Sequence, residues 1–193
     1  MKKREFLAFY KQRYEAKNIG AGDWKFTVET EGGFGYFKIT PRLLRYPPMQ
    51  VVQIGVYTSP SWFAELVGII REDKELNWLL SDILDFCPEN GEVLEEHLPE
   101  ILAMAQEWYE EQSKPKVMAA YLSRVYELKP FRNDVYYYSC VLKGDVDALE
   151  TERVARENGT SKLPPVYTLQ FLTNAVRLAK EYRSGERVCP IDF

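Results

Sequence analysis

The chain has few of the side chains from which metal sites and nucleophilic active sites are built. His97 is its one histidine, and Cys87, Cys140 and Cys189 are its three cysteines. The cysteines are odd in number and widely spaced, with no C-x-x-C pair, which argues against a disulfide framework and a structural zinc site. No family signature surrounds Cys87 or His97 to favour a catalytic pair. We therefore expect buried or inert thiols, no cofactor and no metal.

The chain also lacks long hydrophobic runs and nucleotide-binding glycine motifs. No uncharged apolar stretch approaches the roughly 18 residues of a membrane-spanning helix. The basic N-terminus is not followed by an apolar segment, because Lys11 and Arg13 interrupt it, so we expect no signal peptide. The sequence Gly32-Gly33-Phe34-Gly35 lacks the Lys and Ser/Thr of a phosphate-binding loop. These absences predict a cytoplasmic protein that does not contact the membrane.

The charges are instead sorted by position along the chain. Residues 1–60 carry 10 Lys/Arg and 5 Asp/Glu, residues 61–113 carry 2 and 14, and residues 114–193 carry 13 and 10. Because 46% of the chain is hydrophobic, the acidic block belongs to a segment that can fold. It therefore predicts a surface with a strong negative field, which favours a basic protein partner and disfavours nucleic acid.

The N-terminal part shows the patterns of one helix and a small sheet. Apolar residues spaced three and four apart predict an amphipathic helix over residues 3–17. Alternation of apolar and polar residues predicts half-buried strands, and Glu31-Gly32-Gly33 is typical of a hairpin turn. Gly55 indicates a bulge or close packing. We expect residues 1–60 to form a helix and a three-stranded antiparallel sheet, with strands at 24–28, 34–39 and 51–57.

After Pro60 the apolar period changes to 3.6, which predicts a helical region over residues 61–193, packed on the first part as one globular unit. A strand is the alternative over 134–142, since Tyr136-Tyr137-Tyr138 favours β structure, but Gly144 is a natural helix stop. The predicted fold class is therefore α+β. We expect helices at 62–70, 76–86, 92–112, 115–128, 134–142, 145–157 and 165–182.

The candidate site is the surface of the acidic block. Carboxylates three or four residues apart share one face of a helix, and an exposed aromatic among them would anchor a partner. Such carboxylate pairs are more often a solvated face than a metal site. We expect the partner-binding residues to be Asp82, Asp85, Glu89, Glu92, Glu95, Glu96, Glu100, Glu107, Trp108, Glu110 and Glu111.

The order of elements adds a resemblance to a known class of proteins. A helix, a strand–Gly–strand unit, the segment Val51-Val52-Gln53-Ile54-Gly55-Val56-Tyr57 and then helices resemble small acidic α+β immunity proteins of bacterial polymorphic-toxin systems. The resemblance lies in layout and charge and implies no catalytic residues. It implies a non-enzymatic protein that neutralises a toxin, for example a nuclease with a basic cleft.

Two other functions remain open at this point. Helix pairs over residues 114–182 resemble a short tetratricopeptide-like array, and a groove lined by Tyr121, Tyr137 and Tyr138 would indicate a peptide-binding adaptor. A pocket that gathers two or more carboxylates with His97 would indicate a carboxylate-based metal hydrolase. A homodimer that buries the aromatic stripe is compatible with all three.

Overall fold

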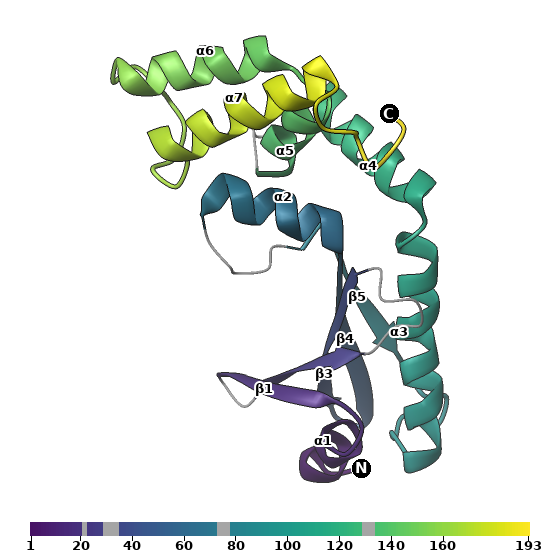
Figure 1. The fold of residues 1–193 in the computed structure, drawn as a ribbon. Coiled ribbons are helices and arrows are strands. Elements are labelled where there is room, and N and C mark those ends of the chain that lie inside the picture. The colour runs from purple at the N-terminus through teal and green to yellow at the C-terminus, as the bar shows by residue number, and fades with distance from the viewer. Residues whose placement is uncertain (21–22, 29–34, 73–77, 129–133) are drawn as a thin grey trace. The chain divides into compact units, whose positions relative to one another are not determined.

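A computed structural model describes residues 1–20, 23–28, 35–72, 78–128 and 134–193, and most of its elements are labelled in Figure 1. It contains helices and one antiparallel sheet, which confirms the predicted α+β class. The chain divides into two compact units. Unit 1 comprises Met1–Ser61 and Trp78–Ser113, and unit 2 comprises Trp62–Asn77 and Lys114–Phe193.

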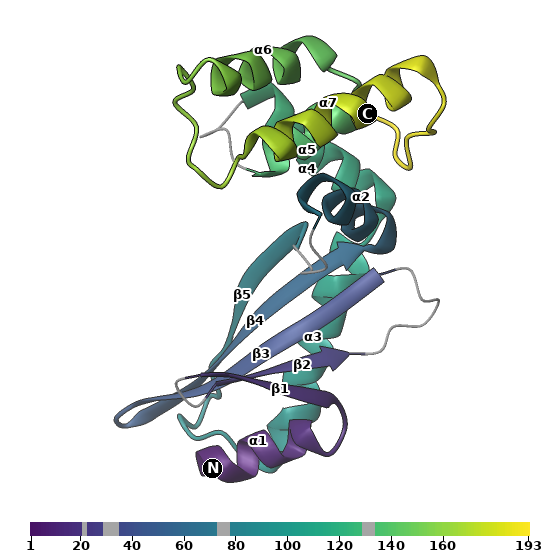
Figure 2. The same ribbon diagram turned by 60° about the vertical axis from the view of Figure 1, so that its left-hand side comes forward.

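Unit 1 is built on a five-stranded sheet with the order β1-β2-β3-β4-β5 (Figure 2). β3 and β4 form a hairpin with twelve residues on each side, joined by Pro47 and Pro48. β5 pairs with the other edge of β4. The elements of unit 1 are α1 (Lys3–Lys11), β1 (Glu15–Gly20), β2 (Asp23–Val28), β3 (Gly35–Tyr46), β4 (Met49–Pro60), β5 (Leu80–Phe86), the 3₁₀ helix η1 (Glu95–His97) and α3 (Leu98–Gln112).

The core of unit 1 lies on one face of this sheet, against α1 and α3. Alternate residues of a strand point to the same face, so Val52, Ile54 and Val56 of β4 are buried together. On α3, the apolar residues recur at intervals of three and four and form the buried stripe. The resulting cluster contains Phe6, Tyr10, Phe26, Ile39, Leu43, Val52, Ile54, Val56, Val93, Leu98, Ile101 and Ala105.

Gly55 lies on the opposite side of β4 from the core residues, directly across from Thr40 of β3. A Cβ atom at this position would collide with the Thr40 hydroxyl and lie 2.9 Å from the Tyr57 hydroxyl. The strand pairing is regular here, with Ile39 opposite Val56 and Pro41 opposite Ile54. Close packing, and not a bulge, therefore accounts for this glycine.

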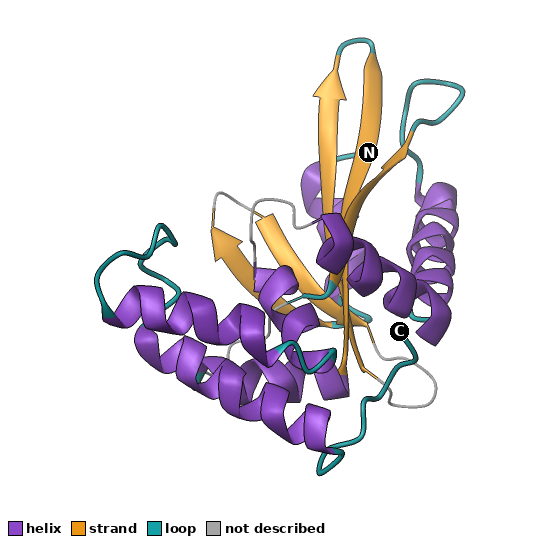
Figure 3. Cartoon of the chain, turned by 90° about the horizontal axis from the view of Figure 1, so that it is seen from above, coloured by secondary structure: helices purple, strands orange, loops and turns teal. Residues whose placement is uncertain are grey.

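The regular elements described in unit 2 are all helices, and the described strands all belong to unit 1 (Figure 3). Every residue of α5 from Tyr136 to Leu142 is buried, as expected of a helix with apolar neighbours on all sides. Asp145 caps α6 by accepting a hydrogen bond from Ala148 N at 3.2 Å. The helices of unit 2 are α2 (Ser61–Arg71), α4 (Pro115–Leu128), α5 (Asp134–Leu142), α6 (Val146–Glu157) and α7 (Leu169–Ser184).

A polar network ties the end of α2 to α5 and α7 within unit 2. Arg71 donates a hydrogen bond from Nε to the Tyr138 hydroxyl at 2.8 Å and forms an ion pair with Asp134. The Asn174 side-chain amide donates to the Ile70 carbonyl at 3.2 Å, which satisfies one of the unpaired carbonyls at the end of α2. The network holds three helices together that are far apart in sequence.

Several predicted elements are confirmed almost to the residue. The predicted helices 115–128 and 134–142 coincide with α4 and α5, and Asp145 caps the next helix, α6. Gly144 follows α5 with a φ of 65°, a left-handed conformation that suits glycine. The predicted hairpin of β2 and β3 is present, while its turn at 31–33 lies outside the described residues.

Several predictions about local structure are wrong: the sheet has five strands and not three, and the helix predicted over 92–112 begins at Leu98, after the 3₁₀ turn η1. The predicted helix over 76–86 contains the strand β5, because pairing with β4 decides the structure of this short apolar segment. The helix predicted over 3–17 ends at Lys11, and β1 follows it at the sheet edge. The strand predicted to end at Ile39 continues to Tyr46, so Tyr46 and the two prolines close a hairpin.

The predicted division at residue 60 also differs from the observed one. Residues 78–113, expected in a helical region, belong to unit 1 and supply β5 and α3. In the part of the chain that the structure describes, no helix is long and apolar enough to cross a membrane.

Candidate protein-binding surface

The ten carboxylates predicted to bind a partner all belong to unit 1 and are all solvent-exposed. We call them the acidic surface. The segment Trp78–Ser113, which carries them, contains no Lys or Arg. The acidic surface consists of Asp82, Asp85, Glu89, Glu92, Glu95, Glu96, Glu100, Glu107, Glu110 and Glu111.

Asp82 and Asp85 lie on a strand, so the prediction that they share a helical face is wrong. Residues three apart on a strand point to opposite faces of the sheet. Asp82 is opposite Val56 and Asp85 is opposite Gln53. β5 therefore presents one carboxylate on each side of the sheet, and Asp85 lies on the side away from the core.

The carboxylates of α3 have the predicted helical spacing. Glu107 lies three residues before Glu110 and four before Glu111, and Glu100 lies two turns earlier. All four are exposed because the buried stripe of α3 faces the sheet. Like charges at such spacings cost an isolated helix a few tenths of a kcal/mol per pair. Their repulsion is an unfavourable energy that a cationic partner would relieve.

Most of the acidic surface has no internal counter-charge. Glu92 accepts a hydrogen bond from the amino group of Met1 at 3.2 Å. Asp82 accepts one from the backbone N–H of Ile83 at 2.8 Å. Among the described residues, no cationic group forms an ion pair with eight of the ten carboxylates: Asp82, Asp85, Glu89, Glu95, Glu96, Glu100, Glu107 and Glu110.

The carboxylates of unit 2 contrast with this pattern. Arg153 pairs with both Glu150 and Glu157 on α6, at 2.9 and 3.2 Å. Glu181 on α7 pairs with Arg177 at 2.6 Å and with Arg187 at 3.3 Å. The two units therefore differ in ion pairing. Many carboxylates of unit 2 form ion pairs within the unit, whereas most carboxylates of the acidic surface on unit 1 contact only solvent.

Trp108 contributes less to this surface than predicted. It is only partly exposed and packs against the core of unit 1. Two other apolar side chains of unit 1 are more exposed than Trp108 and were not predicted as site residues. Tyr46 at the β3–β4 turn is 60% exposed, and Ile83, flanked by Asp82 on β5, is 64% exposed. The alternation around Ile83 would have identified it as outward-facing, had the segment been interpreted as a strand.

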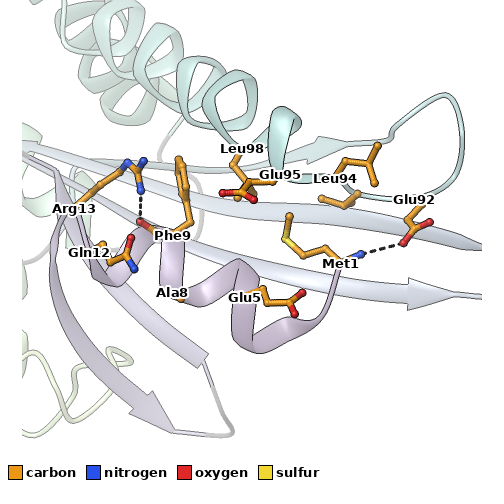
Figure 4. Close-up of a pocket in the computed structure, with 11 residues that line it drawn as sticks. Met1, Glu5, Ala8, Phe9, Gln12, Arg13, Glu92, Leu94, Glu95 and Leu98 are labelled. Carbon is orange, nitrogen blue, oxygen red and sulfur yellow. Dashed lines mark hydrogen bonds and ion pairs between the residues drawn. The ribbon is translucent and has the colours of Figure 1, made fainter.

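A recess adjoins the acidic surface within unit 1. It has a volume of about 520 Å³ and lies between α1 and residues 92–98 (Figure 4). Glu5, Glu92 and Glu95 contribute carboxylates to it. Glu5 was not predicted as a site residue, because its position in the sequence does not reveal that α1 packs beside η1.

His97 does not line this recess. Its Nδ1 accepts a hydrogen bond from Leu94 N at 3.1 Å, and its ring packs against Phe86 with 5.4 Å between centroids. Cys87 is exposed in unit 1, whereas Cys140 is buried and Cys189 half-buried in unit 2. No group of three or more His, Cys, Asp or Glu side chains within the described residues has the geometry to hold a metal ion.

The tyrosines named for a peptide-binding groove do not form one. Tyr137 and Tyr138 are each 1% exposed and belong to the core of unit 2, where Tyr138 packs edge-on against Phe63. Tyr121 is half-buried on α4. The tyrosine run therefore builds the interior of the helical unit, and it lines no concave surface.

A family model with the description "Family of unknown function (DUF6990)" matches residues 2–180. The chain belongs to this family. The DUF6990 match includes every residue of the acidic surface and, apart from Met1, every residue that lines the recess beside it. No curated protein and no solved structure gives a significant match to the chain.

Proposed function

We propose that this chain is a non-enzymatic binding protein whose acidic surface engages a basic protein partner. In its most concrete form, it is an immunity protein that neutralises a bacterial toxin. The proposal rests on one observation above all: eight exposed carboxylates on unit 1 have no cationic partner among the described residues, while unit 2 pairs many of its own acids.

The uncompensated charge suits association with a basic protein. A surface of one sign attracts a partner of the other sign over about 10 Å at 0.1 M salt, which raises the association rate. Contact with Lys or Arg side chains would also relieve the repulsion between Glu107 and Glu110 on α3. Unit 1 also has exposed apolar side chains, such as Ile83 and Tyr46, and burial of their surface against a partner would favour binding.

A nuclease toxin is the partner class that this chemistry fits best. Such an enzyme holds nucleic-acid phosphates with Lys and Arg. The carboxylates of the acidic surface would bind the same cations in place of the phosphates and block substrate access. Charge complementarity of this kind gives fast, salt-sensitive binding, which suits rapid neutralisation of a toxin.

The test is affinity capture with the tagged full chain at about 50 mM and about 300 mM salt, a range over which screening weakens exposed charge pairs. The matched variants are Glu100→Lys/Glu107→Lys/Glu110→Lys on α3 and Glu127→Lys/Glu186→Lys/Asp192→Lys in unit 2. Both triplets are exposed and undergo the same change of charge. We expect the wild-type chain and the unit 2 variant to retain one basic protein at low salt, and the α3 variant to lose it.

The captured protein is then assayed for nuclease activity with and without the purified chain. Inhibition at a one-to-one ratio would support neutralisation. Equal capture by both charge-reversed variants would contradict the role of the acidic surface. Tight binding of a partner whose activity and toxicity are unchanged would contradict the immunity function.

A further inference from the structure

The recess beside α1 combines apolar walls with carboxylates at its rim. Figure 4 shows the Phe9 ring of α1 directed towards Glu95 and Leu98, while the Glu5 carboxylate lies further along α1, beside Met1. Leu94, which is partly exposed, borders it as well. Its volume of about 520 Å³ lies within the range of small-molecule and side-chain binding pockets.

The three carboxylates of the recess differ in what they already bind. Glu5 accepts a hydrogen bond from Lys2 N at 3.0 Å, as part of the N-terminal cap of α1. Glu92 accepts one from the Met1 amino group. The Glu95 carboxylate has no hydrogen bond or ion pair with any described residue, so it is left to the recess and solvent.

The walls indicate which cation fits. The guanidinium of Arg13 already stacks on the Phe9 ring, with Cζ 3.7 Å from the ring centroid, and donates to the Phe9 carbonyl at 2.9 Å. This contact shows that the Phe9 ring binds a planar, weakly hydrated cation, and that Arg13, which also lines the recess, occupies one face of the ring. An arginine side chain would place its methylene groups along Leu94 and Leu98 and its guanidinium against a carboxylate. A lysine ammonium is more strongly hydrated and would lose more on entering an apolar recess.

We propose that this recess receives an arginine side chain of the basic partner, with Glu95 as its carboxylate acceptor and Phe9, Leu94 and Leu98 as its walls. This inference rests on the proposed function, because it specifies how the partner is gripped. The walls exclude part of the water around the charge pair, which strengthens it relative to a pair on the open α3 surface.

The recess can be tested without the partner. The probe is the capped tripeptide acetyl-Gly-Arg-Gly-amide, compared with its lysine and citrulline counterparts, and added to the ¹⁵N-labelled full chain in a two-dimensional NMR titration. Citrulline has nearly the shape of arginine but no charge. We expect saturable shifts at amides of α1 and residues 92–98 with the arginine peptide, weaker binding of the lysine peptide and no saturable shifts with the citrulline peptide.

Two variants with the same change of charge separate the recess from the rest of the acidic surface. Glu95→Gln should weaken binding of the arginine peptide about two- to five-fold, the effect of losing one partly exposed ion pair. Glu107→Gln, an exposed position of α3 outside the recess, should leave it unchanged. Both side chains are exposed and without ion pairs, so neither substitution should disturb folding.

Absence of saturable shifts, or equal binding of the arginine and citrulline peptides, would overturn the proposal. Equal binding of the lysine peptide would overturn the assignment to a guanidinium. Because this experiment uses no partner protein, it can fail while capture through the α3 carboxylates succeeds. The reverse outcome, peptide binding without capture of a basic protein, would remove the proposed function and leave an arginine-binding recess.

Discussion

The Tyr126 hydroxyl on α4 donates a hydrogen bond to Asp145 Oδ2 at 2.8 Å, while Oδ1 of the same carboxylate caps α6 by accepting from Ala148 N. The Asp145 side chain thus caps the N-terminus of α6 and also links α6 to α4. The hydrogen bond, together with partial burial, raises the pKa of Tyr126 from 10.0 to about 12. Asp145 therefore favours the neutral phenol in the folded protein.

This shift predicts a loss of stability in base. Because the pKa of Tyr126 is higher in the folded than in the unfolded chain, its contribution is fully present below pH 10 and is lost as pH rises through about 12. In Tyr126→Phe, the fall in unfolding free energy over this interval should be smaller, as measured by urea denaturation at several pH values. Asp145→Asn, which keeps a capping oxygen, should move the tyrosine titration back towards pH 10. An unchanged titration in Asp145→Asn would contradict this assignment.

A second prediction concerns the close packing at Gly55. Gly55→Ala should destabilise the protein by about 1–3 kcal/mol, because the new methyl group meets Thr40 in a paired region of two central strands. Thr40→Ala removes the atoms with which it collides. In a double-mutant cycle, measured by chemical denaturation, Thr40→Ala should recover part of the loss, with a coupling energy of about 1 kcal/mol. Additive effects of the two substitutions would show that the collision is not the cause.

A third prediction concerns repulsion within the acidic surface in the absence of any partner. Neutralising Glu100, Glu107 and Glu110 together as glutamines should stabilise the protein by about 0.5–1 kcal/mol at low salt, because like charges on one helix repel. The gain should shrink at about 0.5 M salt, where screening is strong. Thermal unfolding checks this, with Glu127→Gln/Glu186→Gln/Asp192→Asn as the matched control. A gain of equal size in the control, or one independent of salt, would refute it.

The elements that sequence patterns predicted well are those with local signals. α5 and α6 were placed correctly because Gly144 and Asp145 mark a helix stop and a helix cap within two residues. β1 carries no such signal. All but one of its six residues are exposed, so it shows no alternation of apolar and polar side chains. It becomes a strand through pairing with β2, an interaction that the period of its own side chains does not reveal.

The helix predicted over residues 76–86 is wrong for a related reason. Its leucines and isoleucine fit a helical spacing as well as a short strand, and pairing of Leu84 with Ile54, thirty residues earlier in the chain, decides between them. The same distinction applies to the candidate site. Charge composition predicted that its carboxylates would be exposed, and they are. The recess depends on α1 packing beside residues more than eighty positions later, for which a single sequence offers no signal.

The path of the chain between β4 and β5 has a practical consequence. These strands are antiparallel neighbours, with Thr58 opposite Leu80, yet α2 lies between them in sequence and packs with α5 and α7. α2 is thus an insertion within a hairpin, and unit 2 is made of two separate segments of the chain.

Cutting the chain after Ser113 would leave Phe63, Leu66 and Ile70 of α2 without the helices they pack against, and these exposed side chains would promote aggregation. A short turn joining Ser61 to Trp78 would instead restore an ordinary hairpin, so the sheet-bearing half should be separable by excision and not by truncation.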